Sequence, residues 1–244
     1  LQLFQALVIG GMLLCFCYSA ATYLILREKT LLFFSLFMLS EIVAELARSG
    51  LLQTYLWPAN LPFDPRVLTL GAAGSIGSIW LFLQGFIPKL QSHRLSHGLA
   101  SGALAVFYAG ILWSLLVDYR NGTVIWTFAV IVWMLSVLLL TILCWRQGAA
   151  TAKLLLQGFM VLIAVELLRL LSVTGRLDFS DIEALGNPVA IALTSAVILV
   201  GMIRRVREMQ TDLAQTRADK AASLSFMSQM SHELRSPLTT ILGQ

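Results

Sequence analysis

The residues best suited to chemistry lie near the end of the chain, in the string Ser231-His232-Glu233-Leu234-Arg235-Ser236-Pro237-Leu238. The imidazole of His232 offers a ring nitrogen that acts as a nucleophile near neutral pH. An acid follows it directly, an arginine stands three positions on, and a proline stands five positions on. Proline removes a backbone donor and favours a bend in a helix. The pattern predicts an activated histidine on a helix that bends shortly afterwards.

This string, with the Ile241-Leu242-Gly243 that follows it, resembles the phospho-accepting box of sensor histidine kinases. The resemblance implies that His232 attacks the γ-phosphate of ATP. It further implies that Glu233 orients the imidazole or takes its proton, that Arg235 assists with the phosphate or a neighbouring acid, and that Pro237 bends the dimerisation helix.

The composition predicts a membrane protein. Hydrophobic residues make up 58% of the 244 residues, charged residues make up 12%, and the mean hydropathy is +0.81. Ordinary soluble domains have about 25% charged residues. The net charge of +4 is scattered and forms no basic stripe, so no nucleic-acid partner is expected. The cysteines (15, 17 and 144) lack metal-type spacing, and His93 and His97 have no acid or cysteine nearby, so no metal site is expected.

Seven apolar stretches approach the length of about 20 residues that a helix needs to cross a bilayer. They are expected at residues 4–26, 31–49, 67–87, 98–117, 123–145, 153–173 and 188–204. Charged residues, prolines and glycines separate them, including Asn121-Gly122 before the fifth span and the segment from Gly175 to Pro188 before the seventh.

The distribution of basic residues predicts the orientation, because cytoplasmic loops carry an excess of lysine and arginine. With the N-terminus outside, nine basic residues lie on the inner side: Arg27, Lys29, Lys89, Arg94, Arg146, Lys153, Arg204, Arg205 and Arg207. Three lie on the outer side: Arg66, Arg120 and Arg176. We therefore expect a multi-pass protein of the bacterial inner membrane with its C-terminus, and His232, in the cytoplasm.

The order of landmarks in the membrane part resembles the bacterial seven-transmembrane receptors with diverse intracellular signalling modules. The landmarks are Gly10-Gly11, Tyr23, Arg27, Gly50 and Tyr55-Leu56-Trp57-Pro58. The resemblance covers about residues 1 to 208. It implies a sensor that often carries an extracytoplasmic β-sandwich ligand domain ahead of the first span. We expect an unknown signal ligand to act through such a preceding domain.

Charged residues inside the spans form a candidate polar network, because such residues are costly in lipid and usually functional. Its members are Glu41, Glu45 and Arg48 on the second span and Glu166 and Arg169 on the sixth. At about 1.5 Å per residue, both groups lie roughly 21–24 Å from the inner ends of their helices. The network either joins the two helices or consists of two local pairs that reach toward the interface.

The third span contains small residues four apart, which let helix backbones approach closely in lipid. The pairs are Gly71/Ser75, Ala73/Gly77 and Gly74/Ser78. Two alternatives remain open at this stage: close packing within the bundle, or a contact between two copies of the chain.

Beyond Gly201 the composition predicts a continuous soluble helix with an apolar seam. The seam comprises Ile203, Val206, Leu213, Leu224, Met227, Leu234, Leu238 and Ile241. It favours a two-helix contact and hence a homodimer, the alternative being a solvated single helix. The expected domains are a seven-transmembrane sensor over 1–206, a signalling helix over 207–225, and the start of a dimerisation and histidine-phosphotransfer domain over 226–244.

We therefore predict an all-α membrane protein, a seven-transmembrane helix bundle that continues into a cytoplasmic signalling helix. The expected function is that of a two-component sensor, which passes its signal to histidine autophosphorylation and then to a response regulator or receiver domain. ATP and Mg²⁺ are expected in a catalytic domain beyond Gln244, so residues 1–244 should bind neither and be inactive alone. The alternative is a transporter, or a non-catalytic receptor scaffold, with a regulatory coiled-coil tail. Membrane lipid is an expected partner in either case.

Overall fold

The computed structural model describes residues 2–56, 66–87, 90, 93–148, 150–173 and 180–242. Side chains are described for most of these residues, but not for 2–5, 55–56, 165–173, 180–188, 231–242 and some isolated positions. The helices are α1 (Gln2–Leu26), α2 (Lys29–Arg48), the short π-helix η1 (Leu52–Leu56), α3 (Arg66–Phe86), α4 (Arg94–Leu116), α5 (Tyr119–Arg146), α6 (Ala150–Val173) and α7 (Ser180–Leu242).

The helices agree with the predicted spans. Within the described part, six are long and apolar enough to cross a membrane, and α6 contributes a shorter apolar run, Thr151–Ala164. The predicted seven-transmembrane, all-α architecture is therefore confirmed. The continuous helix predicted beyond Gly201 is confirmed as well, because α7 extends without interruption to Leu242. The chain forms two compact units, Leu1–Leu199 and Val200–Gln244.

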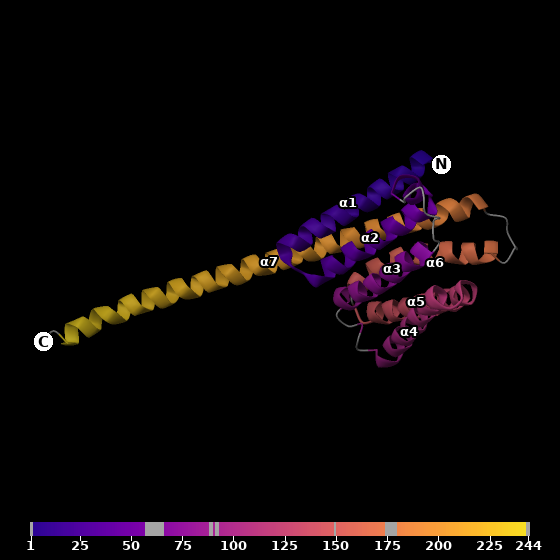
Figure 1. Ribbon diagram of the computed structural model, residues 1–244. Helices are drawn as coiled ribbons and strands as arrows, with labels where there is room; N and C mark the ends of the chain where they lie inside the picture. Colours follow the sequence, from indigo (N-terminus) through magenta and orange to yellow (C-terminus); the bar gives the residue numbers. More distant parts are fainter. Residues whose placement is uncertain are drawn as a thin grey trace. The chain divides into compact units, whose positions relative to one another are not determined.

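Within the first unit, consecutive helices lie side by side and run in opposite directions (Figure 1). The turn between α1 and α2 contains only two residues. Arg27 adopts the left-handed conformation there, with φ 57°, and its amide donates to the carbonyl of Tyr23 at 2.7 Å. A buried hydrogen bond of 2.8 Å between Ser35 and Ser19 joins the two helices further along. The first hairpin is thus held by its turn and by a polar contact between its helices.

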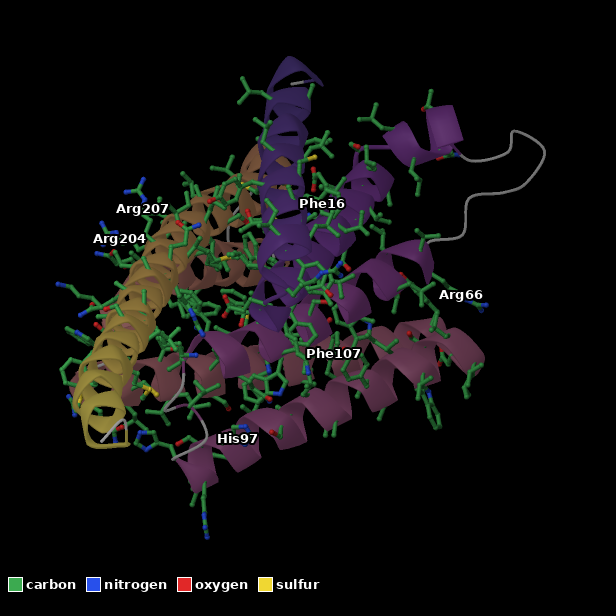
Figure 2. All side chains as sticks on the ribbon, turned by 90° about the vertical axis from the view of Figure 1, so that its left-hand side faces the viewer. Phe16, Arg66, His97, Phe107, Arg204 and Arg207 are labelled. Atoms are coloured by element: carbon green, nitrogen blue, oxygen red, sulfur yellow. The ribbon has the colours of Figure 1, made fainter. Side chains whose placement is uncertain are left out.

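Two apolar clusters lie among the described residues of the bundle. One joins Val8 and Met12 of α1, Ile42 of α2 and Ile191 of α7, with Leu162 of α6 packed against it. The other joins α3, α4 and α5 around Phe107, which is completely buried and makes edge-on ring contacts with Tyr108 and Trp126 (Figure 2). The first cluster therefore joins α1, α2, α6 and α7, and the second joins α3, α4 and α5.

Small residues on α3 permit close contact with its neighbours. A Cβ atom at Gly71 would lie 3.1 Å from the Cβ of Ala44 on α2. On the α4 side, the Tyr108 hydroxyl donates to the carbonyl of Ala73 at 2.9 Å. Of the two alternatives raised by the α3 spacing, close packing within the bundle is confirmed.

The structure corrects two predicted breaks. Asn121-Gly122 does not form the turn before the fifth span, because α5 already begins at Tyr119 and the chain turns at Val117 and Asp118. Gly122 instead lets α5 approach Ser114 on α4, where any side chain would collide with the Ser114 backbone. The break before the seventh span is also shorter than predicted, since α7 begins at Ser180, ahead of Pro188.

The contact between α4 and α5 yields a matched pair of substitutions within one helix. A Cβ atom at Gly110 would lie 2.9 Å from the Trp126 amide nitrogen, whereas a Cβ atom at Gly102 would meet nothing within 4 Å. We expect Gly110→Ala to lower the stability of the bundle by about 1–3 kcal/mol, because the helices must separate. Gly102→Ala should be neutral or stabilising by up to about 1 kcal/mol. Thermal unfolding of the purified chain in detergent measures both, and equal midpoints for the two variants would contradict this packing.

Candidate functional site

The polar cluster that the structure describes lies in the C-terminal half of α2. Glu41, Glu45 and Arg48 lie four and three residues apart and therefore share one face of the helix. The Glu45 side chain is only 4% exposed and that of Arg48 is 33% exposed. Arg48 occupies the last turn of the helix, where a cation interacts favourably with the helix dipole.

One guanidinium serves both carboxylates. Arg48 Nη1 lies 3.1 Å from Glu45 Oε2, and Nη2 lies 3.7 Å from Glu41 Oε2. Glu45 Oε2 makes no hydrogen bond, so within the described residues its charge is compensated by this ion pair. The planar, forked geometry of arginine suits it to bridging two acids in this way.

The cluster extends to α3 through Ser75, whose hydroxyl donates a hydrogen bond to Glu41 Oε1. We call Glu41, Glu45, Arg48 and Ser75 the α2–α3 polar cluster. Gly71 and Gly74 make this contact possible, because Cβ atoms there would press against Ala44 and Ser40 of α2. The predicted local pairing of Glu45 with Arg48 is therefore present, but the cluster also joins two helices.

The role of Ser75 as a hydrogen-bond donor to Glu41 was not predicted from the sequence. The spacing of small residues on α3 indicated only that Ser75 permits close helix packing. Its position did carry information, because Ser75 lies on the side of α3 that carries the glycines. Polar side chains on such a side form hydrogen bonds between helices in lipid. The spacing on α3 did not indicate which neighbouring helix would supply the acceptor.

Two other predicted members, Glu166 and Arg169, belong to α6, but their side chains lie outside the described residues. Leu162, one turn before Glu166, packs against the cluster that contains Ile42 and Leu46. This contact brings α6 alongside the part of α2 that carries Glu45. The proposed link between α2 and α6 stays a prediction.

The string Ser231–Leu238 lies in the last part of α7, which is helical through Leu242. The side chains of His232, Glu233, Arg235 and Pro237 lie outside the described residues, so their assigned roles stay predictions.

The N-terminal end of α4 carries the histidine pair. The His97 ring lies 5.3 Å from the Trp80 ring, and neither His93 Nε2 nor His97 Nε2 has a hydrogen-bond partner. Figure 2 places His97 and Arg66 at opposite ends of the bundle, as expected for the starts of two antiparallel helices. Among the described residues, no three His, Cys, Asp or Glu side chains form a group that could hold a metal.

The family of the chain follows from its match to a family model described as 7TM diverse intracellular signalling, which covers residues 1–205. The chain belongs to this family. The 7TM diverse intracellular signalling match spans α1 to α6 and the membrane part of α7, and so includes the α2–α3 polar cluster. Comparisons with curated proteins and with solved structures gave no significant match.

The 7TM diverse intracellular signalling assignment, together with the membrane-spanning helices, identifies the first unit as a seven-transmembrane receptor domain of a multi-pass membrane protein. The α2–α3 polar cluster is the charged group that the described part of this domain holds between its spans.

Loss of the shared cation should destabilise this receptor domain. Arg48→Gln leaves Glu41 and Glu45 facing each other without a guanidinium, and we expect a loss of about 1–3 kcal/mol, reduced from buried-pair values because Arg48 is partly exposed. The double variant Arg48→Gln/Glu45→Gln should recover part of that loss. Lys153→Gln, an exposed cation on α6, serves as the control. Thermal midpoints in detergent report the differences, and an Arg48→Gln midpoint equal to that of the control would argue against the shared ion pair.

Proposed function

We propose that the chain is the sensing and phospho-accepting part of a two-component sensor histidine kinase. The observation that carries this proposal is α7, a single helix from Ser180 to Leu242 that includes both the last span and the His232 string. A receptor domain of the 7TM diverse intracellular signalling family is thereby connected, without an intervening loop, to a string that resembles a phospho-accepting box.

The basic residues favour the inner side for this helix. Arg204 and Arg207 are exposed in the last turn of the span Val189–Arg207 of α7, and Figure 2 shows both side chains pointing away from the helix. Exposed arginines at the end of a span mark the cytoplasmic side. An N-terminus outside and a C-terminus in the cytoplasm of a bacterium would give His232 access to ATP, with Mg²⁺ and ATP held by a catalytic domain elsewhere in the protein.

We further propose that the α2–α3 polar cluster takes part in sensing, together with Glu166 and Arg169 of α6. Ion pairs and hydrogen bonds between spans have discrete arrangements, so a signal that alters one of them can shift helix positions. The signal itself is expected to arrive from the extracytoplasmic side, where α2 and α6 end in the proposed orientation.

The phosphorylation step is tested in the intact parent protein. His232 should form an acid-labile, base-stable phosphohistidine when the membranes receive radiolabelled ATP, and His232→Gln should abolish it. Glu233→Gln should slow the transfer about 10–100-fold, as expected for loss of a general base. His93→Gln, a histidine of the membrane domain, is the control and should retain normal labelling. Undiminished phosphate in His232→Gln would disprove the assignment.

We also propose that α7 pairs with a second copy of itself. Leu224 and Met227 are 68% and 62% exposed in the single chain. They begin a heptad series that continues through Ser231, Leu234, Leu238 and Ile241, at alternating spacings of three and four. In this register His232 follows a seam position and is not part of the seam, so the phosphorylated residue and the dimer contact do not compete. The response regulator would approach this paired helix.

Cysteine cross-linking measures the pairing. In a background that lacks Cys15, Cys17 and Cys144, single cysteines at Leu224 and Met227 should form disulfide-linked dimers in membranes. Cysteines at Ala222 and Ser225, which lie off the seam, should cross-link several-fold less. A uniform yield at all four positions would contradict a defined two-helix contact.

A further inference from the structure

Gly158 of α6 and Thr194 of α7 lie directly opposite each other in the contact between these helices. The Thr194 hydroxyl donates a hydrogen bond of 3.0 Å to the carbonyl of Gly158, and both residues are buried. A Cβ atom at Gly158 would lie 3.1 Å from Thr194 Cγ2, closer than most real contacts of this kind. The position of α7 against α6 is therefore set by a hydrogen bond and by the absence of a side chain at Gly158.

The next residue on α7 provides a second hydroxyl. Ser195 is completely buried, and its Oγ has no hydrogen-bond partner among the residues that the structure describes. Other buried hydroxyls of the bundle, at Ser114 and Thr141, each donate to a carbonyl of their own helix. Ser195 differs from them, since a buried donor without an acceptor is unfavourable.

Adjacent residues of a helix are separated by about 100° around its axis. Rotation of α7 would therefore carry the Thr194 hydroxyl away from Gly158 and bring the Ser195 hydroxyl toward α6. In the arrangement observed, Thr194 donates to α6 and Ser195 does not.

We propose that Gly158, Thr194 and Ser195 form a hydrogen-bond switch that selects between two rotational positions of α7. In the observed position Thr194 donates to Gly158 and Ser195 is unbonded. In the second position Ser195 is the donor to α6. Because α7 continues to Leu242 as one helix, each position presents a different face of the following residues. The role of the switch in kinase regulation depends on the proposed function, but the rotation itself does not.

The test maps the rotation directly in the full chain. Single cysteines are placed at each position from 203 to 210, in a background lacking the native cysteines, and their reaction rates with a maleimide are measured in opened membrane vesicles. The parent should give a periodic profile. Gly158→Ala and Thr194→Val should each move the reactive maximum by about one residue, because both remove the observed contact.

Three variants make the result specific. Thr194→Ser keeps the hydroxyl and should preserve the parent profile, which shows that the hydrogen bond matters and that substitution at this site does not disrupt the fold. Thr194→Val/Ser195→Ala removes both donors and should flatten the profile. Gly98→Ala, where a Cβ would meet nothing within 4 Å, is the control for a glycine in a span and should change nothing.

Profiles of Gly158→Ala and Thr194→Val that superimpose on that of Gly98→Ala would overturn the switch. A shifted profile in Thr194→Val that persists unchanged when Ser195→Ala is added would also overturn it, since Ser195 would then not be the alternative donor. A shift with no change in phosphorylation of the parent would support the switch while contradicting its connection to a kinase, so the two proposals can fail separately.

Discussion

The fold depends on a constraint of the bilayer: backbone donors and acceptors have no water to bind there and must be satisfied within the chain. Each helix pairs its own backbone donors and acceptors and needs no other helix to do so. This explains why the spans match the apolar runs of the sequence so closely. The constraint does not by itself bring helices together, because lipid tails are as apolar as leucine side chains. Association has to come from close packing and from polar contacts between helices.

Both kinds of contact recur between neighbouring helices. Among the described residues, hydrogen bonds link α1 to α2 (Ser35 to Ser19), α2 to α3 (Ser75 to Glu41), α3 to α4 (Tyr108 to Ala73) and α6 to α7 (Thr194 to Gly158). Polar contacts of this kind average about 0.6 kcal/mol in membranes. Each is weak enough to be exchanged by a modest signal, yet each defines one relative position of two helices. This suits a receptor domain, whose helices must shift to transmit a signal.

The sequence was enough to predict where the helices lie, but not which helices contact one another. Apolar length located all seven spans, and the absence of Gly and Pro between Gly201 and Ala222 correctly predicted a continuous helix over that stretch. The turn predicted at Asn121-Gly122 was wrong. An Asn-Gly pair that favours a turn in a loop is equally compatible with the first turn of a helix when the glycine packs against Ser114. Ser75 was also missed as the partner of Glu41, since spacing within one helix defines a face but not the helix opposite. The pairing of α2 with α6 and the roles of the His232 string stay predictions for the same reason: they depend on contacts beyond the described side chains or beyond this chain.

The central claim is that one helix connects an inward-facing end of the receptor domain to the phospho-accepting string in the cytoplasm. Its most direct test is the sidedness of two exposed positions, Thr54 at the predicted outer end of the bundle and Ser225 on α7. Each is replaced by cysteine in a background without native cysteines and treated with a membrane-impermeant maleimide in intact cells with a permeable outer membrane. Thr54→Cys should react in intact cells, and Ser225→Cys should react only after the inner membrane is broken. Reaction of Ser225→Cys in intact cells would place α7 on the outer side and would contradict the account.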